Sequence, residues 1–381
     1  MQKDIIKEKY LSKFGTTSGT VYAAPGRINL IGEHTDYNEG YVFPGAIDKC
    51  IIANIDCNNT MTVCAYSIDI DEYVEFDLQN MEAPTPMWAR YIYGVCREMQ
   101  DKGIQIKGFN TVFAGDIPLG AGMSSSAALE SCYAFALNDI FGANIISKMD
   151  LAKIGQNTEH KYVGVNCGIM DQFASVFGKE GYLMRLDCRS MEHEYFPFAP
   201  HKDGYRVVLL DSVVKHELVD SPYNKRRESC EHVSKTLGVV SLREASIDNL
   251  KAIKSSISEE DFKRAKYVIE EKQRVLDVCQ ALKVKDYETV GACMYKTHKG
   301  LSEDYEVSCE ELDFLNEIAL VCGVSGSRIM GGGFGGCTIN LVKKELCETF
   351  IERAKKLFIN KFGHAPKVYE VIISDGARRI D

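Results

Sequence analysis

The order of strand-like and helix-like segments limits the fold of this chain more than any other feature. β-rich runs broken by glycine and proline come first, at residues 20–23, 28–31, 51–55, 61–66 and 72–76. Helical spacing follows at 87–100, 125–138 and 150–160, with strand-like runs at 108–114, 181–186 and 206–211. Helices then dominate up to residue 362. Because strands and helices do not alternate regularly, the sequence predicts an α+β (mixed α/β) fold rather than a doubly wound sheet.

The length of 381 residues exceeds what one ordinary core holds and fits two domains. A proline- and histidine-bearing stretch between residues 192 and 204 interrupts the pattern. We therefore expect an N-terminal domain over residues 1–195 and a C-terminal domain over residues 196–381.

The charge balance narrows the class of partner. A formal net charge of −9 argues against nucleic acid or an acidic membrane surface as the main partner. No apolar run approaches the ~20 residues that cross a bilayer, and the first ten residues carry charges where a signal peptide needs an apolar core. The 14 cysteines lie in apolar runs without a CxxC motif, so we expect reduced, mostly buried thiols in a cytoplasmic protein. Small anionic ligands remain possible.

The stretch PLGAGMSSSAALE, residues 118–130, indicates an anion site. Gly120 and Gly122 allow close approach of a ligand to the backbone. The three serines open a predicted helix, whose first N–H groups and partial positive charge suit a phosphate. The alternative is an ordinary serine-capped helix. The P-loop pattern and the protein-kinase signatures are absent, so a nucleotide here would not lie in a Walker A loop.

Two further segments are rich in glycine or charge. The loop GGGFGG, residues 331–336, has more glycines than a turn needs, which favours close approach to a ligand or another loop over a flexible connection. In GRINLIGEHTDY, residues 26–37, charged side chains flank Leu30 and Ile31, so the segment is expected to be half buried and its charges to have partners or a ligand. Glu33 and Asp36 suit vicinal sugar hydroxyls, whereas His34 alone is more typical of a structural hydrogen-bonding group.

Asp171, in CGIMDQFAS, has two readings. It lies where a helix is expected to begin, and aspartate is a favoured N-cap. The functional reading is a carboxylate that accepts a proton. The residues alone favour the cap.

Together these motifs resemble those of a known family. GRINLIGEHTDY resembles the signature of galactokinases, and PLGAGMSSSAALE and RIMGGGFGGCTI are similar to motifs of the wider GHMP small-molecule kinases. NCGIMDQFAS and SPYNKRRESCE also resemble galactokinase segments, and the order is preserved along essentially the whole chain. The resemblance implies a two-domain fold with the active site in the cleft between the domains. It also implies phosphorylation of the anomeric hydroxyl of galactose by ATP, with Mg²⁺.

The resemblance further implies roles for individual residues. Asp171 would be the general base and Arg27 would stabilise the transition state. Ser126 and Glu159 would hold Mg²⁺, and Ser67 would approach the nucleotide. The sugar would be bound by Glu33, His34, Thr35, Asp36, Gly168, Asp171 and Tyr223. The ATP phosphates would be wrapped by Gly120, Ala121, Gly122, Met123, Ser124, Ser125 and Ser126.

Several alternatives stay open at this point. Asp171 could orient the sugar hydroxyl instead of accepting its proton. The substrate could be N-acetylgalactosamine, galacturonate or arabinose. A catalytically silent sensor of galactose and ATP is another possibility, although the intact Ser126-Ala127-Ala128 favours an enzyme. The resemblance favours a monomer.

Overall fold

The computed structural model describes residues 2–118, 120–214 and 222–381, with the side chains of residues 2, 222 and 223 left out. Its first lobe is built on a mixed sheet in the order β13-β1-β3-β6-β4-β5. Neighbouring strands are antiparallel except β4 and β6. The strands are β1 (Thr20–Asn29), β3 (Pro44–Cys57), β4 (Thr62–Ser67), β5 (Glu72–Asp77), β6 (Phe109–Gly115) and β13 (Arg378–Arg379).

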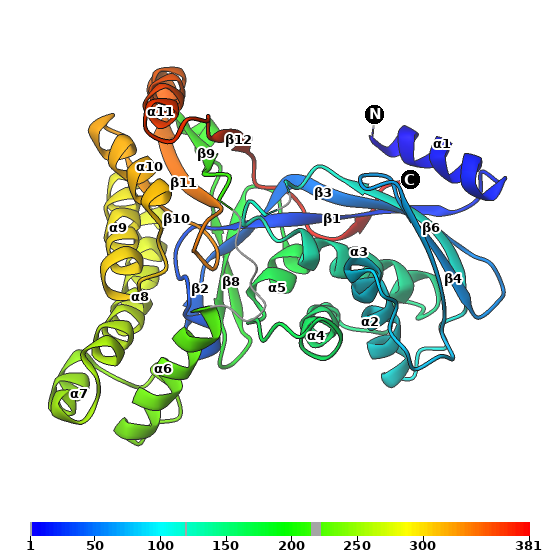
Figure 1. Cartoon of the computed structure of the whole chain (residues 1–381), viewed down its shortest axis with the longest axis horizontal. Helices are drawn as coiled ribbons and strands as arrows, with labels where there is room; N and C mark the ends of the chain where they lie inside the picture. Colours follow the sequence, from blue (N-terminus) through cyan, green and yellow to red (C-terminus); the bar gives the residue numbers. More distant parts are fainter. Residues whose placement is uncertain (1, 119, 215–221) are drawn as a thin grey trace.

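Helices cover both faces of this sheet (Figure 1). Four of them lie on one face, where two contact β1 and β3 directly and the other two pack against those helices. They are α2 (Met87–Asp101), α3 (Ser125–Ile140), α4 (Lys148–Thr158) and α5 (Met170–Phe177). Helix α1 (Gln2–Phe14) covers the other face, where Ile6 and Tyr10 are fully buried.

A small antiparallel sheet, β2-β7-β8, lies toward the second lobe (Figure 1). Its strands are β2 (Tyr41–Val42), β7 (Tyr182–Asp187) and β8 (His193–Pro197). The stretch in which the sequence pattern is interrupted thus contains a strand.

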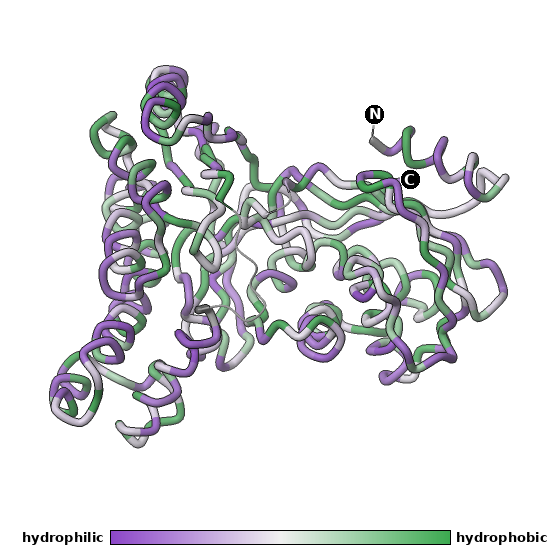
Figure 2. The backbone as a smooth tube through the Cα atoms, viewed as in Figure 1, coloured by the Kyte–Doolittle hydropathy of each residue, from purple (hydrophilic) through white to green (hydrophobic). Residues whose placement is uncertain are grey.

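The second lobe combines an antiparallel sheet, in the order β10-β11-β9-β12, with most of the helices. The strands are β9 (Tyr205–Asp211), β10 (Gly326–Ile329), β11 (Cys337–Lys343) and β12 (Lys367–Val371). The helices are α6 (Pro222–Leu237), α7 (Ile247–Ala252), α8 (Glu259–Lys283), α9 (Tyr287–Lys299), α10 (Glu310–Val321) and α11 (Cys347–Phe362). Hydrophilic and hydrophobic residues alternate along α8 and α9, as expected for helices with one buried face (Figure 2).

The two lobes share their largest hydrophobic core. Val275 and Leu282 of α8 and Ile339 of β11 belong to the same cluster of buried residues as the core of the first sheet. The C-terminal part of the chain returns to the first lobe, because β13 pairs with β1 through Tyr22 and Ala23. Both termini therefore lie on the first lobe (Figure 1). The predicted division between residues 195 and 196 stays a prediction.

The mixed α+β fold expected from the sequence is confirmed. Most predicted elements agree with the observed bounds within a few residues, but the runs at 20–23 and 28–31 belong to the single strand β1, and β3 begins well before the run predicted at 51–55. All 14 cysteines are free, and none is exposed. Among the described residues, no helix is both long and apolar enough to cross a membrane.

Candidate active site

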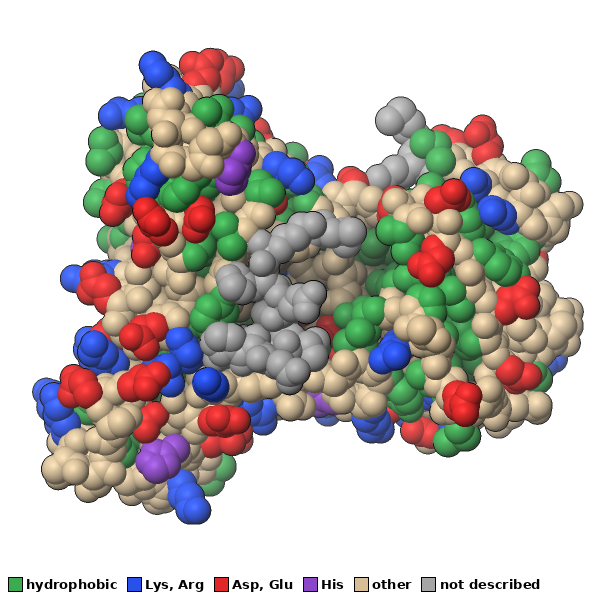
Figure 3. Space-filling view, viewed as in Figure 1, with side chains coloured by type: hydrophobic (Ala, Val, Ile, Leu, Met, Phe, Trp, Pro, Cys, Tyr) green, Lys and Arg blue, Asp and Glu red, His purple; other side chains and the backbone are tan. Residues whose placement is uncertain are grey.

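A cavity of about 230 Å³ brings the sequence motifs together. It lies where the lobes meet, and the space-filling view shows an indentation between them (Figure 3). Its lining comes from the 26–37 signature, the glycine/serine loop (within residues 118–130), the segment before α5 and the 331–336 loop. The predicted residues that line it are Arg27, Glu33, His34, Asp36, Gly120, Gly122, Met123, Ser124, Ser125, Ser126, Glu159, Gly168 and Asp171.

An arginine–aspartate pair lies in the cavity wall. Arg27, near the end of β1, donates from Nε to Asp171 Oδ1 (2.7 Å) and from Nη2 to Oδ2 (3.0 Å). Both side chains line the cavity, but Arg27 is 4% exposed and Asp171 is 31% exposed, so the carboxylate is the more accessible of the two. Burial opposes the charge of Arg27, but the carboxylates of Asp171 and Glu33 outweigh it and raise the pKa of the guanidinium. A rigid bidentate pair of this kind fixes both partners in orientation.

The N-cap interpretation of Asp171 is wrong. Ile169 is the N-cap of α5, and Asp171 is the second residue of the helix. The carboxylate turns to Arg27 instead, and its Oδ2 also accepts a hydrogen bond from the hydroxyl of Ser124. The side chain is thus free of a capping role and available at the cavity.

The serine-cap alternative for the 118–130 loop is also excluded. Ser124 precedes α3 with φ +60°, and its side chain makes no capping hydrogen bond. Ser125 and Ser126 begin the helix and line the cavity. Because the first N–H groups of a helix have no partner within the helix, this end of α3 can receive an anion.

The 331–336 loop packs against the glycine/serine loop, as its glycine content suggested. A Cβ on Gly122 would lie 3.1 Å from the carbonyl oxygen of Met330, and one on Gly336 would lie 3.7 Å from that of Gly120. Gly122 and Gly336 have φ +72° and +78°, which side chains rarely adopt. The glycines therefore allow two backbones to meet directly beneath the cavity.

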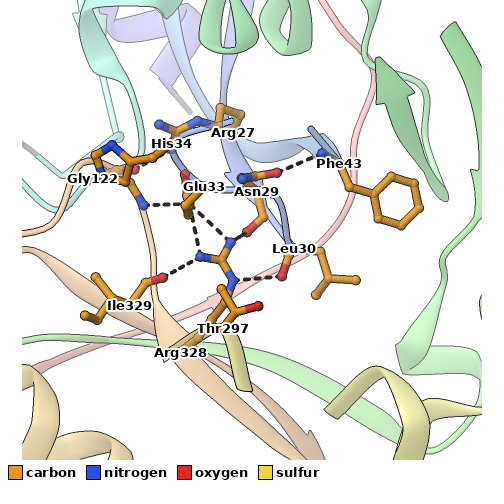
Figure 4. A network of polar contacts seen from close by, with 12 residues as sticks. Arg27, Asn29, Leu30, Glu33, His34, Phe43, Gly122, Thr297, Arg328 and Ile329 are labelled. Carbon is orange, nitrogen blue, oxygen red and sulfur yellow. Dashed lines mark hydrogen bonds and ion pairs between the residues drawn. The ribbon is translucent and has the colours of Figure 1, made fainter. Parts of the chain in front are cut away.

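Glu33 is held by a buried arginine of the second lobe (Figure 4). Arg328 of β10 is fully buried, and its Nη1 and Nη2 lie 3.2 and 3.1 Å from Glu33 Oε1. The same oxygen accepts a hydrogen bond from the N–H of Gly331 (2.8 Å). Arg328 also donates to the carbonyl oxygens of Asn29 and Leu30. The arginine thus fixes both the carboxylate and the backbone of the signature.

Helix α8 makes a second attachment to the signature. The carboxylate of Glu271 is fully buried and accepts a hydrogen bond from the N–H of Gly32 (2.7 Å). Its other oxygen accepts from Arg274 Nε (2.6 Å) and Thr297 Oγ1 (2.7 Å). The signature therefore takes its position from the second lobe as well as from β1.

Asp36 lies directly against Gly168. A Cβ on Gly168 would overlap the Asp36 carboxylate, so only glycine fits there. Burial, together with the charges of Asp171 and Glu33, raises the pKa of Asp36 to about 6. The carboxylate is available to accept hydrogen bonds from a ligand above that pH.

His34 has structural partners at both ring nitrogens. Nδ1 lies 2.7 Å from the hydroxyl of Tyr37, and Nε2 lies 3.2 Å from the carbonyl oxygen of Gly332. Burial, with the charges of Arg226 and Arg328, lowers the pKa of His34 to about 3. The ring is therefore neutral, and it ties the signature to the 331–336 loop.

Glu159 and Ser126 face one another across the cavity wall. Glu159 directly follows α4 and opens a π-helical turn, Glu159–Val163, a feature frequent at functional sites. Burial raises the pKa of Glu159 to about 7, while hydrogen bonds from Ser126 and Cys167 lower it.

Comparison with known proteins agrees with this geometry. Three family models match: the galactokinase galactose-binding signature over residues 8–56, the GHMP kinases N-terminal domain over 90–179 and the GHMP kinases C-terminal domain over 279–360. The galactokinase of Clostridium beijerinckii is 39% identical over 387 aligned residues that cover 99% of both chains. The galactokinase of Thermotoga maritima is 41% identical over 358, covering 94% of this chain and 99% of its own.

The chain belongs to the galactokinase family of GHMP kinases. It is an ATP-dependent sugar kinase. The crystal structure of Lactococcus lactis galactokinase complexed with galactose is 32% identical and superposes with a TM-score of 0.94 over 100% of both chains. Methanococcus jannaschii mevalonate kinase, at 16% identity and a TM-score of 0.67, shares the fold.

Four residues implied by the galactokinase resemblance do not line the cavity or cannot be placed in it. Thr35 is buried, and its hydroxyl donates to the carbonyl oxygens of Gly32 and Tyr41. Ala121 and Ser67 are buried outside the lining. The side chain of Tyr223, near the start of α6, lies outside the described residues. Their roles stay predictions.

Sequence reasoning missed the residues that hold the galactokinase signature from the second lobe. Arg328, shortly before the 331–336 loop, is charged and fully buried. The arginine itself, in an otherwise apolar run, was the available signal. Nothing in the helical pattern of α8 distinguished Glu271.

Proposed function

We propose that this chain transfers the γ-phosphoryl group of ATP to the anomeric hydroxyl of D-galactose, giving galactose 1-phosphate and ADP. The observation that carries the proposal is the Arg27–Asp171 pair, placed in one cavity between the galactokinase signature and the glycine/serine loop. Phosphoryl transfer depends mainly on positioning and on stabilising charge, and this cavity supplies both. The likeness to the galactokinase complexed with galactose supports galactose as the acceptor.

Asp171 is proposed to take the proton of the anomeric hydroxyl. Both of its oxygens already accept hydrogen bonds, from Arg27 and Ser124, so proton uptake must weaken one of them. The weakened hydrogen bond is compatible with catalysis if the proton leaves late, after the sugar oxygen has begun to bond to phosphorus. The same geometry would also allow Asp171 to orient the hydroxyl.

Arg27 is proposed to stabilise the charge that develops on the γ-phosphoryl oxygens. Its guanidinium lies between Asp171 and the carbonyl oxygen of Gly122, just before the start of α3. Positive charge preorganised in a partly dry site stabilises a transition state without reorganisation. The N–H groups at the start of α3 and residues 120–126 are proposed to bind the ATP phosphates.

Ser126 and Glu159 fit a Mg²⁺ ion that accompanies ATP. Both are oxygen donors, and they face one another at the cavity. Within the part of the chain that is described, no three His, Cys, Asp or Glu side chains form a metal cluster. That suits magnesium, which is usually held by one or two protein oxygens together with phosphates and water. When bound, the ion would neutralise phosphate charge.

Glu33 and Asp36 are proposed to accept hydrogen bonds from the sugar hydroxyls. In Glu33, Oε1 is occupied by Arg328 and Gly331, so the carboxylate is held in one orientation at the cavity. We further propose a monomer, which the resemblance to galactokinases favours, and a cytoplasmic location, because the thiols are free.

The test is ADP release from MgATP with galactose, N-acetylgalactosamine, glucose, arabinose and galacturonate offered separately. Turnover on galactose in preference to the others is expected. Preferred turnover of another sugar would assign that sugar as the substrate. Binding of galactose and ATP without turnover would overturn the catalytic assignment.

Asp171→Asn tests the role of the carboxylate. The amide keeps the size of the side chain but cannot accept the proton. We expect kcat to fall at least about 10²-fold, the low end of the usual range for a general base. Near-normal turnover would contradict the assignment of Asp171 as the base.

A further inference from the structure

A chain of hydroxyl groups, fully buried at Tyr305, leads from the 26–37 signature into the second lobe. The hydroxyl of Tyr37 lies 2.7 Å from His34 Nδ1 and 2.8 Å from the hydroxyl of Tyr305. The Tyr305 hydroxyl in turn lies 3.4 Å from the sulfur of Cys230 on α6. These groups join three segments that are far apart in the sequence.

The directions of these hydrogen bonds follow from chemistry. A carbonyl oxygen only accepts, so His34 Nε2 must carry a hydrogen and donate it to Gly332. The ring is neutral because burial lowers the pKa of His34, so Nδ1 is an acceptor and Tyr37 donates to it. The hydroxyl of Tyr37, having donated its hydrogen to the ring, accepts the hydrogen of Tyr305.

Tyr305 is itself held firmly in place. It is fully buried and directly follows the π-helical turn Gly300–Asp304. Its carbonyl oxygen accepts a hydrogen bond from Arg226 Nε (2.7 Å). Its ring centroid lies 4.9 Å from those of both His34 and Tyr267, and Tyr267 donates to the carbonyl oxygen of Glu33 (3.1 Å). A side chain fixed on so many sides can impose its position on its neighbours.

We propose that Tyr305 is a positioning residue for the sugar, acting through Tyr37 to hold the His34 ring in one tautomer and orientation at the cavity wall. The inference rests on the proposed function, because it assumes that the cavity beside His34 receives the sugar. It goes beyond that function by assigning sugar recognition to residues that do not line the cavity. The 331–336 loop is held through the same ring, at Gly332.

The test is Tyr305→Phe, which removes only the hydroxyl. The KM for galactose is expected to rise about three- to tenfold, in line with the loss of one buried hydrogen bond, while the KM for ATP changes less than twofold. Tyr295→Phe is the matched control, because that hydroxyl donates to the carbonyl oxygen of Val324 in the same lobe, away from the cavity. It should leave both constants unchanged.

A double-mutant cycle distinguishes positioning from general damage. If the hydroxyls act in series, Tyr37→Phe raises the KM for galactose at least as much, and adding Tyr305→Phe to it has little further effect. Histidine ¹⁵N NMR should show the Nε2–H tautomer of His34 in the wild-type protein and a changed signal in Tyr305→Phe.

Three results would overturn the inference: an unchanged KM for galactose, equal rises for galactose and ATP, or full additivity in the double variant. Failure of the proposed function would look different, because the wild-type protein would then not phosphorylate galactose.

Discussion

The contact between Gly168 and Asp36 leaves no room for a side chain at residue 168. Because a methyl group on Gly168 would overlap the Asp36 carboxylate, Gly168→Ala must displace that side chain from the cavity wall. We expect the KM for galactose to rise about tenfold or more, equivalent to at least ~1.4 kcal/mol, with little change in the KM for ATP. Steady-state kinetics with each substrate varied would measure both constants.

Gly204→Ala is the control for that experiment. The added methyl group of this variant meets no atom within 4 Å, although φ is +83°, so it reports the cost of backbone strain alone. An equal change of KM in the two variants would refute a specific effect at Gly168.

The raised pKa of Asp36 predicts a pH dependence of sugar binding. With a pKa of about 6, the carboxylate is ionised at pH 7 but mostly protonated at pH 5, where one of its oxygens carries a hydrogen and donates instead of only accepting. The KM for galactose should therefore rise about tenfold from pH 7 to pH 5. The Asp36→Asn variant should bind galactose weakly at both pH values, without the tenfold change in KM. If that change persists in the variant, the titrating group is not Asp36.

The raised pKa of Asp36 also affects the free energy of unfolding, because proton binding and folding are thermodynamically linked. Between the ordinary value of 3.8 and about 6, the folded protein holds this proton more tightly than the unfolded chain does. The contribution of Asp36 to the free energy of unfolding therefore decreases as the pH rises through that window.

At the scale of elements, strand β10 holds the signature through Arg328. Arg328→Met would leave the Glu33 carboxylate buried without its cation, so we expect a loss of about 3–5 kcal/mol in the free energy of unfolding. Urea denaturation would measure it. The control is Arg206→Met, which breaks the partly exposed pair with Glu370 and should cost less than about 1 kcal/mol.

Two outcomes of that experiment are informative. If Arg328→Met costs no more than Arg206→Met, the buried pair does not hold the signature. Adding Glu33→Gln should recover part of the loss, because the unpaired buried charge is then removed.

The sequence predicts elements well where the reason is local. The helix from Ser125 and the strand ending near Asp211 follow from periodicity and turn residues, and the observed bounds agree closely. The N-cap interpretation of Asp171 was wrong for a local reason. The sequence around a helix start does not show whether a carboxylate caps the helix or turns to Arg27. The pairing of Glu33 with Arg328, 295 residues away, has no local signal.

At the scale of the whole molecule, the cavity depends on both lobes. Glu33 and His34 come from the first lobe, but Arg328 and Gly332 of the second fix their positions. The family resemblance indicated a cleft between the domains but not the attachments that make it. These attachments and the shared core make each lobe a structural support of the other.

This arrangement predicts that the lobes unfold together. Trp88, the single tryptophan, lies on α2 and packs against Phe113, so its fluorescence reports on the first lobe. Far-UV circular dichroism is weighted toward the long helices of the second lobe, such as α8. Because the largest core spans both lobes and β13 returns to β1, the two probes should give one urea midpoint. Separate midpoints would show that each lobe is stable alone. The cavity would then lie at the interface between two independently folding lobes.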